Sequence, residues 1–309
     1  MRKIYFILNP KAGQGNKIKK LIHKIKDQVP ESEIYITKSQ GDAEDFVRNA
    51  CLSHSSCDSL RFISCGGDGT FNEILNGVVG FPNAEVGIVP IGTGNDFCRN
   101  FDDCGDFFDL SAQANGTSIS CDAIKYTSNE KTRFCANMFN IGFDCNVVDL
   151  AAKLKTYPLI SGPLAYLLAV PAILIAKKGA NIAIEADGKN IYNGELLLTS
   201  IANGKFCGGG MKSNPDASIH NGFIDLNIIY NVSRFEFLKK FPFYIKGTHG
   251  KLPDIKKVIL NLKAKKMTIT PNNKSIRLCT DGEISNANKI DFECVKDAFK
   301  FVLPESNKA

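Results

Sequence analysis

The turn over residues 65–70, Cys-Gly-Gly-Asp-Gly-Thr, constrains the fold of this chain more than any other stretch. It follows an apolar run over 60–64 and precedes apolar residues at helical spacing, which predicts a strand, a turn and a helix. Three glycines around Asp68 leave room for backbone N–H groups to approach phosphate oxygens closely. The negative charge of the Asp68 carboxylate would repel phosphates unless a magnesium ion bound between them. A plain tight turn with an aspartate cap is the alternative, because glycine-rich turns are common.

Two further loops are rich in the same residue types. One follows an apolar run over 4–8 and reads Asn-Pro-Lys-Ala-Gly over 9–13; the other follows a strand expected over 86–90 and reads Ile-Gly-Thr-Gly-Asn-Asp over 91–96. Strand-like and helix-like periodicities alternate between these loops, which favours a parallel sheet covered by helices on both faces. Ligands bind beyond the carboxyl ends of the strands in such sheets, so the three loops are expected to form one site.

Composition narrows the class of protein. The 309 residues are enough for two domains, and 44% hydrophobic with 23% charged residues is typical of a soluble globular protein. The net charge of +6 fits an anionic partner, such as a nucleotide or an acidic membrane surface, without requiring one. No nucleic acid is expected as a partner. The common GxxxxGK[ST] phosphate loop and the three-glycine dinucleotide fingerprint are both absent.

Cysteine usage and the N-terminus bear on the compartment. The 11 cysteines form no CxxC pair and the four histidines are far apart in sequence, so a zinc site is not expected. We expect a cytosolic chain with reduced cysteines. Met1-Arg2-Lys3 runs directly into a strand, so no signal peptide is expected.

The pattern changes near Cys121. Short alternating runs follow, with turn signals at 128–131 and at Asp187-Gly188, and they predict a mostly antiparallel second domain. Leu159 to Ala176 is the most apolar segment, but two prolines and Gly162 interrupt it, whereas a membrane span needs roughly 20 apolar residues. We expect broken helices at a domain junction that cover an apolar pocket; a buried core helix is equally compatible. Lysines over 239–266 are either solvated or face a membrane.

Taken together, the motifs resemble the diacylglycerol kinase catalytic domain family. They are Asn9-Pro10-x-Ala12-Gly13, Gly66-Gly67-Asp68-Gly69-Thr70-x-Asn72-Glu73 and Pro90-x-Gly92-Thr93-Gly94-Asn95-Asp96-Phe97-x-Arg99, followed in the expected order by 140–144, 202–204 and Thr280-Asp281-Gly282-Glu283. The resemblance covers essentially the whole chain. It implies an α/β nucleotide-binding domain like that of NAD kinases and phosphofructokinases over 1–122, completed by 300–309, and a β-sandwich domain over 123–299.

The resemblance also implies an activity and a set of site residues. The expected enzyme is an ATP- and Mg2+-dependent lipid kinase that phosphorylates diacylglycerol to phosphatidic acid. Glu283 stands at the family's proposed general base, and Asp68 is the second expected catalytic residue. Phosphoryl transfer needs positioning, charge neutralisation and a proton acceptor, which fits these residue types. The expected ATP-binding residues are Asn9, Thr37, Gly66, Gly67, Asp68, Gly69, Thr70, Asn72 and Thr93.

One position departs from the family. Relatives often carry an aspartate that ligates a structural magnesium ion, where this chain has Asn221. The expected ligands here are the Asn221 amide oxygen and the backbone carbonyls of Ser218 and Phe223. An amide carries no charge and binds magnesium more weakly, so this site is in doubt.

The expected partners are a lipid substrate and an anionic membrane surface, contacted peripherally from the cytoplasm; a homodimer stays open. NAD kinase is the alternative enzyme, because it shares the Gly-Gly-Asp-Gly-Thr turn. Asn72-Glu73 and the Gly-Thr-Gly-Asn-Asp-Phe run over 92–97 favour the lipid branch. A further alternative is a non-catalytic module that senses nucleotide and tethers to membrane. The presence of both expected catalytic residues, Asp68 and Glu283, disfavours it.

Overall fold

The computed structural model describes residues 2–12, 15–55, 57–101, 106–154, 156–157, 160, 162–176 and 179–304. Gly13 of the first expected loop, Leu159 of the apolar segment and residues 305–309 lie outside these ranges.

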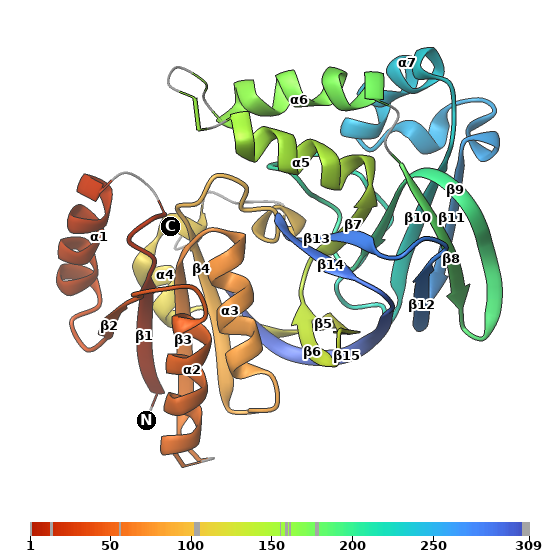
Figure 1. Ribbon diagram of the computed structural model, residues 1–309. Coiled ribbons are helices and arrows are strands. Elements are labelled where there is room, and N and C mark those ends of the chain that lie inside the picture. Colours follow the sequence, from red (N-terminus) through yellow and green to blue (C-terminus); the bar gives the residue numbers. More distant parts are fainter. Residues whose placement is uncertain are drawn as a thin grey trace.

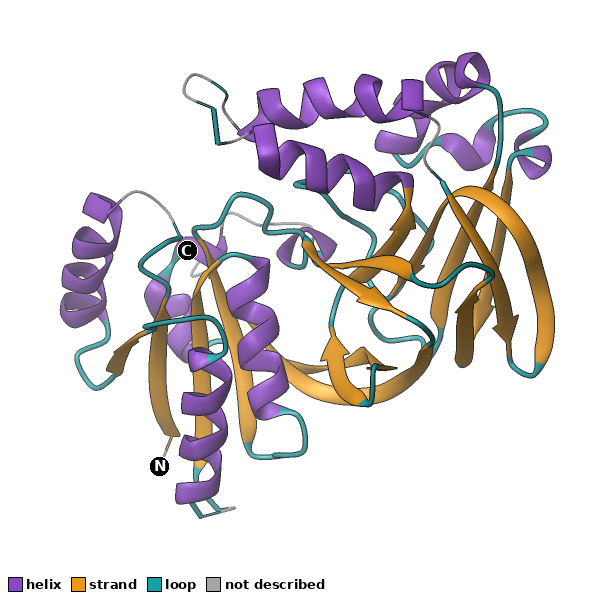
Figure 2. Ribbon diagram, in the orientation of Figure 1, coloured by secondary structure: helices purple, strands orange, loops and turns teal. Residues whose placement is uncertain are grey.

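The N-terminal part alternates strands and helices, as expected (Figures 1 and 2). Its strands pair in parallel in the order β2-β1-β3-β4. Phe6 and Leu8 pack with α1, whereas Tyr5 and Ile7 pack with α2 and α3, so helices cover both faces of the sheet. The elements are β1 (Arg2–Leu8), α1 (Gly15–Gln28), β2 (Glu33–Ile36), α2 (Asp42–Ser53), β3 (Ser59–Gly66), α3 (Asp68–Val78) and β4 (Ala84–Pro90).

A short connecting region leads into the second part of the fold. It contains two 3-10 turns, η1 (Cys98–Asn100) and η2 (Asp106–Phe108), and helix α4 (Leu110–Asn115). Antiparallel strands then dominate, which confirms the expected change of pattern. The first are β5 (Thr117–Ser128), β6 (Lys131–Cys135), β7 (Met138–Gly142), β8 (Ala180–Ala186), β9 (Lys189–Ala202) and β10 (Ile224–Tyr230). The last are β11 (Ile259–Ala264), β12 (Lys266–Pro271), β13 (Ile276–Thr280), β14 (Glu283–Ala287) and β15 (Ile290–Leu303).

Strand β15 joins the parallel and antiparallel parts into one mixed sheet. β15 pairs with β5 and β12, and near its end Phe301 lies opposite Val86 of β4 in parallel. The expected domain limits at 122/123 and 299/300 therefore fall inside β5 and β15. The division into 1–122 with 300–309 and 123–299 stays a prediction.

A layer of helices covers one end of the antiparallel part (Figure 1). It consists of α5 (Phe143–Leu154), α6 (Gly162–Ala176), α7 (Arg234–Ile245) and the turns η3 (His249–Lys251) and η4 (Ile255–Lys257). The expected break at Gly162 coincides with the start of α6, but Pro171 lies inside this helix instead of ending it. Pro171 is exposed. Within the described ranges, no helix is long and apolar enough to cross a membrane.

Candidate active site

The glycine-rich turn links β3 to α3 and packs tightly against the loop after β4. A Cβ on Gly66 would lie 2.4 Å from Oγ1 of Thr70, and a Cβ on Gly92 would lie 2.3 Å from the Cα of Gly67. Side chains are therefore excluded at both contacts. The Gly92 N–H also donates to the Gly66 carbonyl at 3.0 Å, which fixes the two loops side by side.

Asp68 is the first residue of α3, and its carboxylate holds the loop after β4 in place. Oδ1 accepts the Asp96 N–H at 2.7 Å and Oδ2 accepts the Asn95 N–H at 2.8 Å. Asn95 adopts a left-handed backbone conformation, with φ of 53°, and its Nδ2 donates to the Pro90 carbonyl. The sequence predicted Asp68 beside phosphates, but its role in bracing this loop was not expected.

The loops after β1 and β2 lie on the other side of the turn. Asn9 Nδ2 donates to Thr70 Oγ1 at 3.0 Å, and the Asn9 N–H donates to the Cys65 carbonyl at the end of β3. The Thr37 N–H donates to the Leu8 carbonyl at 2.9 Å, and Thr37 is buried. These contacts bring the carboxyl ends of β1, β2 and β3 to one edge.

A pocket of about 240 Å³ opens at this edge. Five of the predicted site residues line it: Asn9, Thr37, Gly69, Thr70 and Glu283. Gly66, Gly67, Asp68, Asn72 and Thr93 are not among its lining residues, although Gly67 and Asp68 directly precede Gly69 at the start of α3. The lining also includes residues that sequence reasoning did not assign: Pro10, Lys11, Lys38, Ser39, Gln40 and Glu73.

Glu283 reaches this pocket from the antiparallel part. It begins β14 directly after a two-residue turn, in which Asp281 and Gly282 have φ of 45° and 91°. This is the tight turn that the sequence predicted. Both carboxylate oxygens of Glu283 accept from Gln40 Nε2 at 3.2 Å, and a Cβ on Gly69 would lie 3.7 Å from Oε1. Glu283 therefore faces the N-terminus of α3 across the pocket.

Two further acids lie close to Asp68 between the two parts of the fold. Burial, together with the charge of Asp68, raises the pKa of Asp281 to about 7 and the pKa of Asp96 to about 6. Asp281 accepts the Met138 N–H at 3.2 Å and the Cys135 thiol at 3.1 Å. The sequence did not predict that Asp281 is buried, because the residues around it, Cys135 and Met138, come from a distant segment of the chain.

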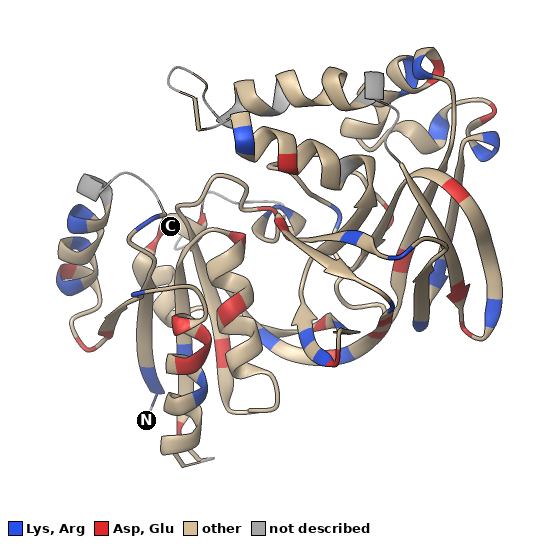
Figure 3. Ribbon diagram, viewed as in Figure 1, with Lys and Arg blue, Asp and Glu red and all other residues tan. Residues whose placement is uncertain are grey.

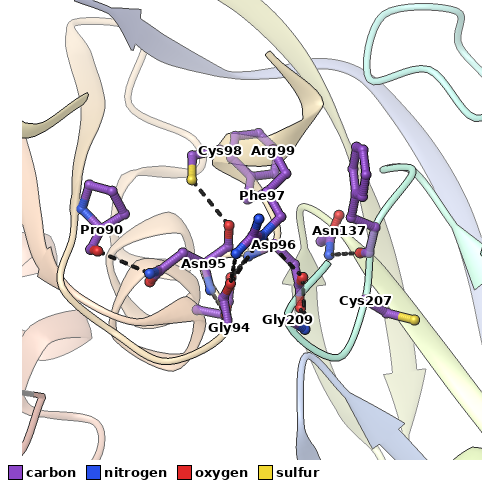
Figure 4. A network of polar contacts seen from close by, with 12 residues as sticks. Pro90, Gly94, Asn95, Asp96, Phe97, Cys98, Arg99, Asn137, Cys207 and Gly209 are labelled. Carbon is purple, nitrogen blue, oxygen red and sulfur yellow. Dashed lines mark hydrogen bonds and ion pairs between the residues drawn. The ribbon is translucent and has the colours of Figure 1, made fainter. Parts of the chain in front are cut away.

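Asp96 also connects the two parts through a glycine loop. The Gly209 N–H donates to both Asp96 oxygens at 3.0 Å, as Figure 4 shows. The predicted pairing of Asp96 with Arg99 is a looser contact of 3.9 Å, and the guanidinium also donates to the Gly94 carbonyl at 3.3 Å. A backbone amide thus makes the shorter contact to this carboxylate.

The expected structural metal site lies on the turn before β10. Asn221 Oδ1 accepts the Phe223 N–H at 3.0 Å, and Ser218 Oγ accepts the His220 N–H at 3.4 Å. Asp122 of β5 accepts the Gly222 N–H at 2.7 Å, so a carboxylate already supports this turn. Magnesium ligation by the three predicted residues stays a prediction.

The donor set beside the pocket fits a magnesium ion that is shared with phosphates. Each Asp68 oxygen accepts one backbone N–H, and a carboxylate offers about four acceptor positions in all. In the part of the chain that the structure describes, no three His, Cys, Asp or Glu side chains could hold a metal by themselves. Magnesium usually takes one or two carboxylates and completes its shell with phosphates and water, which agrees with this arrangement.

Comparison with known proteins covers the chain almost completely. Residues 3–126 match the sequence profile of the diacylglycerol kinase catalytic domain, and residues 137–303 match that of the YegS C-terminal NAD kinase beta sandwich-like domain. A diacylglycerol kinase from Staphylococcus aureus strain RF122 is 31% identical over 302 residues, covering 95% of this chain and 90% of that protein. A diacylglycerol kinase from Bacillus subtilis is 28% identical over 312 residues, covering 99% and 97%.

Solved structures support the fold. A putative diacylglycerol kinase from Bacillus anthracis superposes with a TM-score of 0.73 at 23% identity, covering 97% of this chain and 96% of the other. An NAD kinase from Archaeoglobus fulgidus in complex with ATP gives a TM-score of 0.50 at 11% identity, covering 99% and 94%. Both parts of the expected fold class, the parallel α/β part and the β-sandwich-like part, are confirmed.

Proposed function

The chain belongs to the diacylglycerol kinase family, and we propose that it transfers the γ-phosphoryl group of ATP to the hydroxyl of diacylglycerol, forming phosphatidic acid. It is an ATP-dependent lipid kinase. The NAD kinase alternative rests on a structural relative at 11% identity, which supports a common fold only.

One observation carries the proposal: Glu283 of the antiparallel part lies in the same pocket as the glycine-rich turn of the parallel part. A phosphate group at the N-terminus of α3 would receive backbone N–H groups and the positive end of the helix dipole. Asn9 and Thr70 line the same wall and offer polar side chains. Thr37, Asn72 and Thr93 are the further predicted nucleotide contacts, and they belong to this proposal.

Charge neutralisation would come from two sources. Lys11 and Lys38 line the pocket and offset phosphate charge. Asp68 would hold a magnesium ion, which would supply further neutralisation of phosphate charge.

Glu283 supplies the proton acceptor. The lipid hydroxyl oxygen attacks the γ-phosphorus, the bond to the bridging oxygen of ADP breaks, and the hydroxyl proton passes to a Glu283 oxygen. Gln40 holds that carboxylate toward the pocket. A carboxylate fits this step because a lipid hydroxyl is a weak nucleophile at neutral pH.

We also propose that the enzyme works in the cytoplasm and binds the membrane peripherally, since its acceptor is a lipid. Figure 3 shows Lys or Arg residues along α1 and near α7, which suits an anionic surface. Self-association and a structural magnesium ion at Ser218, Asn221 and Phe223 stay predictions.

The test is transfer of label from γ-labelled ATP to a panel of acceptors. Label in phosphatidic acid, formed only when diacylglycerol is present, supports the proposal. Label transferred to NAD instead would support the NAD kinase alternative. Nucleotide binding without ATP consumption, with every lipid supplied, would support a non-catalytic module.

A further inference from the structure

Helix α7 has two apolar faces, of which only one is buried. Phe237 and Tyr244 are buried, and they pack with Phe143 of α5 and Ile229 of β10 in one apolar cluster. Phe237 and Phe143 make an edge-on ring contact at 5.1 Å. This face anchors α7 to the body of the protein, so the helix does not need its other face for stability.

The other face of α7 points apolar side chains into solvent. Phe235, Leu238 and Phe243 are 80%, 52% and 41% exposed. At about 100° per residue, these three side chains and exposed Pro242 fall within roughly 140° of the helix circumference, away from buried Phe237. Exposed aromatic side chains that gather in this way mark an interaction surface, because isolated monomers rarely expose contiguous apolar area.

Basic residues accompany this apolar face. Lys239 and Lys246 are exposed and fall on the same side of the helix by their spacing. The two acids within 234–257 are paired: Glu236 with Lys240 at 3.1 Å, and Asp254 with Lys257 at 3.1 Å. Over 234–257 there are seven Lys or Arg against these two acids: Arg234, Lys239, Lys240, Lys246, Lys251, Lys256 and Lys257.

We propose that the exposed face of α7, defined by Phe235, Leu238, Lys239, Phe243 and Lys246, inserts into the surface of an anionic phospholipid bilayer. The proposal rests on the proposed function, because it identifies the surface through which the enzyme reaches its lipid acceptor. An interfacial helix buries aromatic and aliphatic side chains at the boundary of headgroups and acyl chains, while lysines contact anionic headgroups.

The surrounding structure agrees with this orientation. Leu164 and Leu168 of α6, one turn apart in the same helical layer, are 40% and 45% exposed. Figure 1 shows this layer on the same side of the molecule as the carboxyl ends of β1, β3 and β4, where the pocket opens. A membrane that contacts the layer would lie on the side from which the lipid must enter.

A second copy of the chain is the other occupant to consider. A two-fold contact through this face would pair each surface with itself and bring Lys239 and Lys246 of both copies together. Like charges in a desolvated contact disfavour such a dimer. Charge complementarity therefore favours the anionic bilayer.

The chain contains no tryptophan, so one substitution supplies a sole reporter. Phe235→Trp in the full-length protein is mixed with vesicles of equal parts phosphatidylcholine and phosphatidylglycerol. Its emission is expected to shift to shorter wavelength, and the shift should weaken in phosphatidylcholine alone. Leu52→Trp on α2, at a residue 68% exposed, is the matched control and should not shift. Equal shifts at both positions, or none at Phe235→Trp, would overturn the proposal.

Vesicle sedimentation measures the contribution of each component. Phe235→Ser with Leu238→Ser should weaken binding about tenfold or more, because two apolar side chains lose their burial. Lys239→Glu and Lys246→Glu should each weaken binding to anionic vesicles about fivefold or more. Leu52→Ser and Lys189→Glu, at exposed positions on other elements, should bind as the unsubstituted chain does.

Two further measurements separate this inference from the proposed function. With a water-soluble short-chain diacylglycerol, the Ser variants should phosphorylate as fast as the unsubstituted enzyme. If no diacylglycerol is phosphorylated while the vesicle shift persists, the function fails and the surface stands. If phosphorylation proceeds but the Ser variants bind vesicles unchanged, the surface is wrong. Sedimentation equilibrium showing a dimer that Phe235→Ser dissociates would replace the membrane with a second copy.

Discussion

Gln40 donates through one Nε2 to both carboxylate oxygens of Glu283, at 3.2 Å each, across 243 positions of sequence. The amide comes from the loop between β2 and α2, and the acid comes from the start of β14. Two other charged groups act on Glu283, namely Glu73 of α3 and Arg133 of β6, and Lys11 and Lys38 line the same pocket. Gln40 is therefore a neutral donor that orients the proposed base among charged neighbours.

Gln40→Leu removes this donor while keeping a side chain of similar size. Turnover is expected to fall about 3- to 10-fold, since the hydrogen bond to the charged acid is partly exposed. The KM for ATP should stay unchanged. In the Glu283→Gln background the substitution should have no further effect; an equal loss there would assign Gln40 a role apart from Glu283.

Asp68 is expected to support both activity and the loop after β4. Asp68→Ala should abolish lipid phosphorylation and lower the free energy of unfolding by about 1–3 kcal/mol, because the Asn95 and Asp96 N–H groups lose their acceptor. Asp68→Asn keeps the shape and one oxygen, so it should recover part of the stability but not the activity. Urea unfolding and label transfer on the same preparations check both effects. An active Asp68→Ala enzyme would exclude Asp68 from the site.

Gly92→Ala tests the contact between the glycine-rich turn and the loop after β4. The new Cβ would lie 2.3 Å from the Cα of Gly67, so the backbone must separate. We expect a destabilisation of about 1–3 kcal/mol and at least a tenfold loss of turnover, because small displacements of reacting groups are costly. Gly250→Ala is the matched control, since nothing lies within 4 Å of its Cβ. Turnover of Gly92→Ala equal to that of the control would contradict the close packing of the loops.

The buried acid Asp281 makes stability depend on pH. Its pKa is about 7 in the folded chain against an ordinary value of 3.8. The folded state therefore holds the proton more tightly, and the free energy of unfolding should fall as pH rises from about 4 to about 8. Asp281→Asn should match the unsubstituted chain near pH 4 and exceed its stability by about 2–4 kcal/mol near pH 8.

The control for this pH effect is Asp254→Asn, at an exposed acid in the turn before η4. Its effect on the free energy of unfolding should stay within about 0.5 kcal/mol at both pH values. Parallel pH dependence in the unsubstituted chain and in Asp281→Asn would show that other groups control the acid response.

Local patterns were enough to predict the framework of the site. Glycine-rich loops after apolar runs located three strand ends, and the Asp187-Gly188 turn and the Asp281-Gly282 turn emerged as hairpins with left-handed backbone angles. Hydrophobic periodicity and turn-forming residues depend on a few neighbouring positions, so they can be recognised in a single sequence. The return of β15 to β4 was implied by the family resemblance, because it joins segments that are far apart in sequence.

Contacts between distant segments could not be predicted in this way. Gln40 lies in an ordinary loop and acquires a role only because the fold brings Glu283 beside it. Asp281 is buried beside strands β7 and β13. These two strands pair with each other, although more than a hundred residues separate them in sequence. Pro171 predicted a break but lies inside α6, at an exposed position.

The most direct test of the account compares the unsubstituted enzyme with Glu283→Gln in one experiment, in which ATP binding and label transfer to diacylglycerol are measured on the same preparation. Glu283→Gln keeps the size of the side chain and removes its basicity. We predict unchanged ATP affinity, an unchanged free energy of unfolding and a fall in lipid phosphorylation of about 10²–10⁴-fold. Unchanged ATP affinity with unchanged lipid phosphorylation would contradict the account, because the proton of the lipid hydroxyl would then leave by another route.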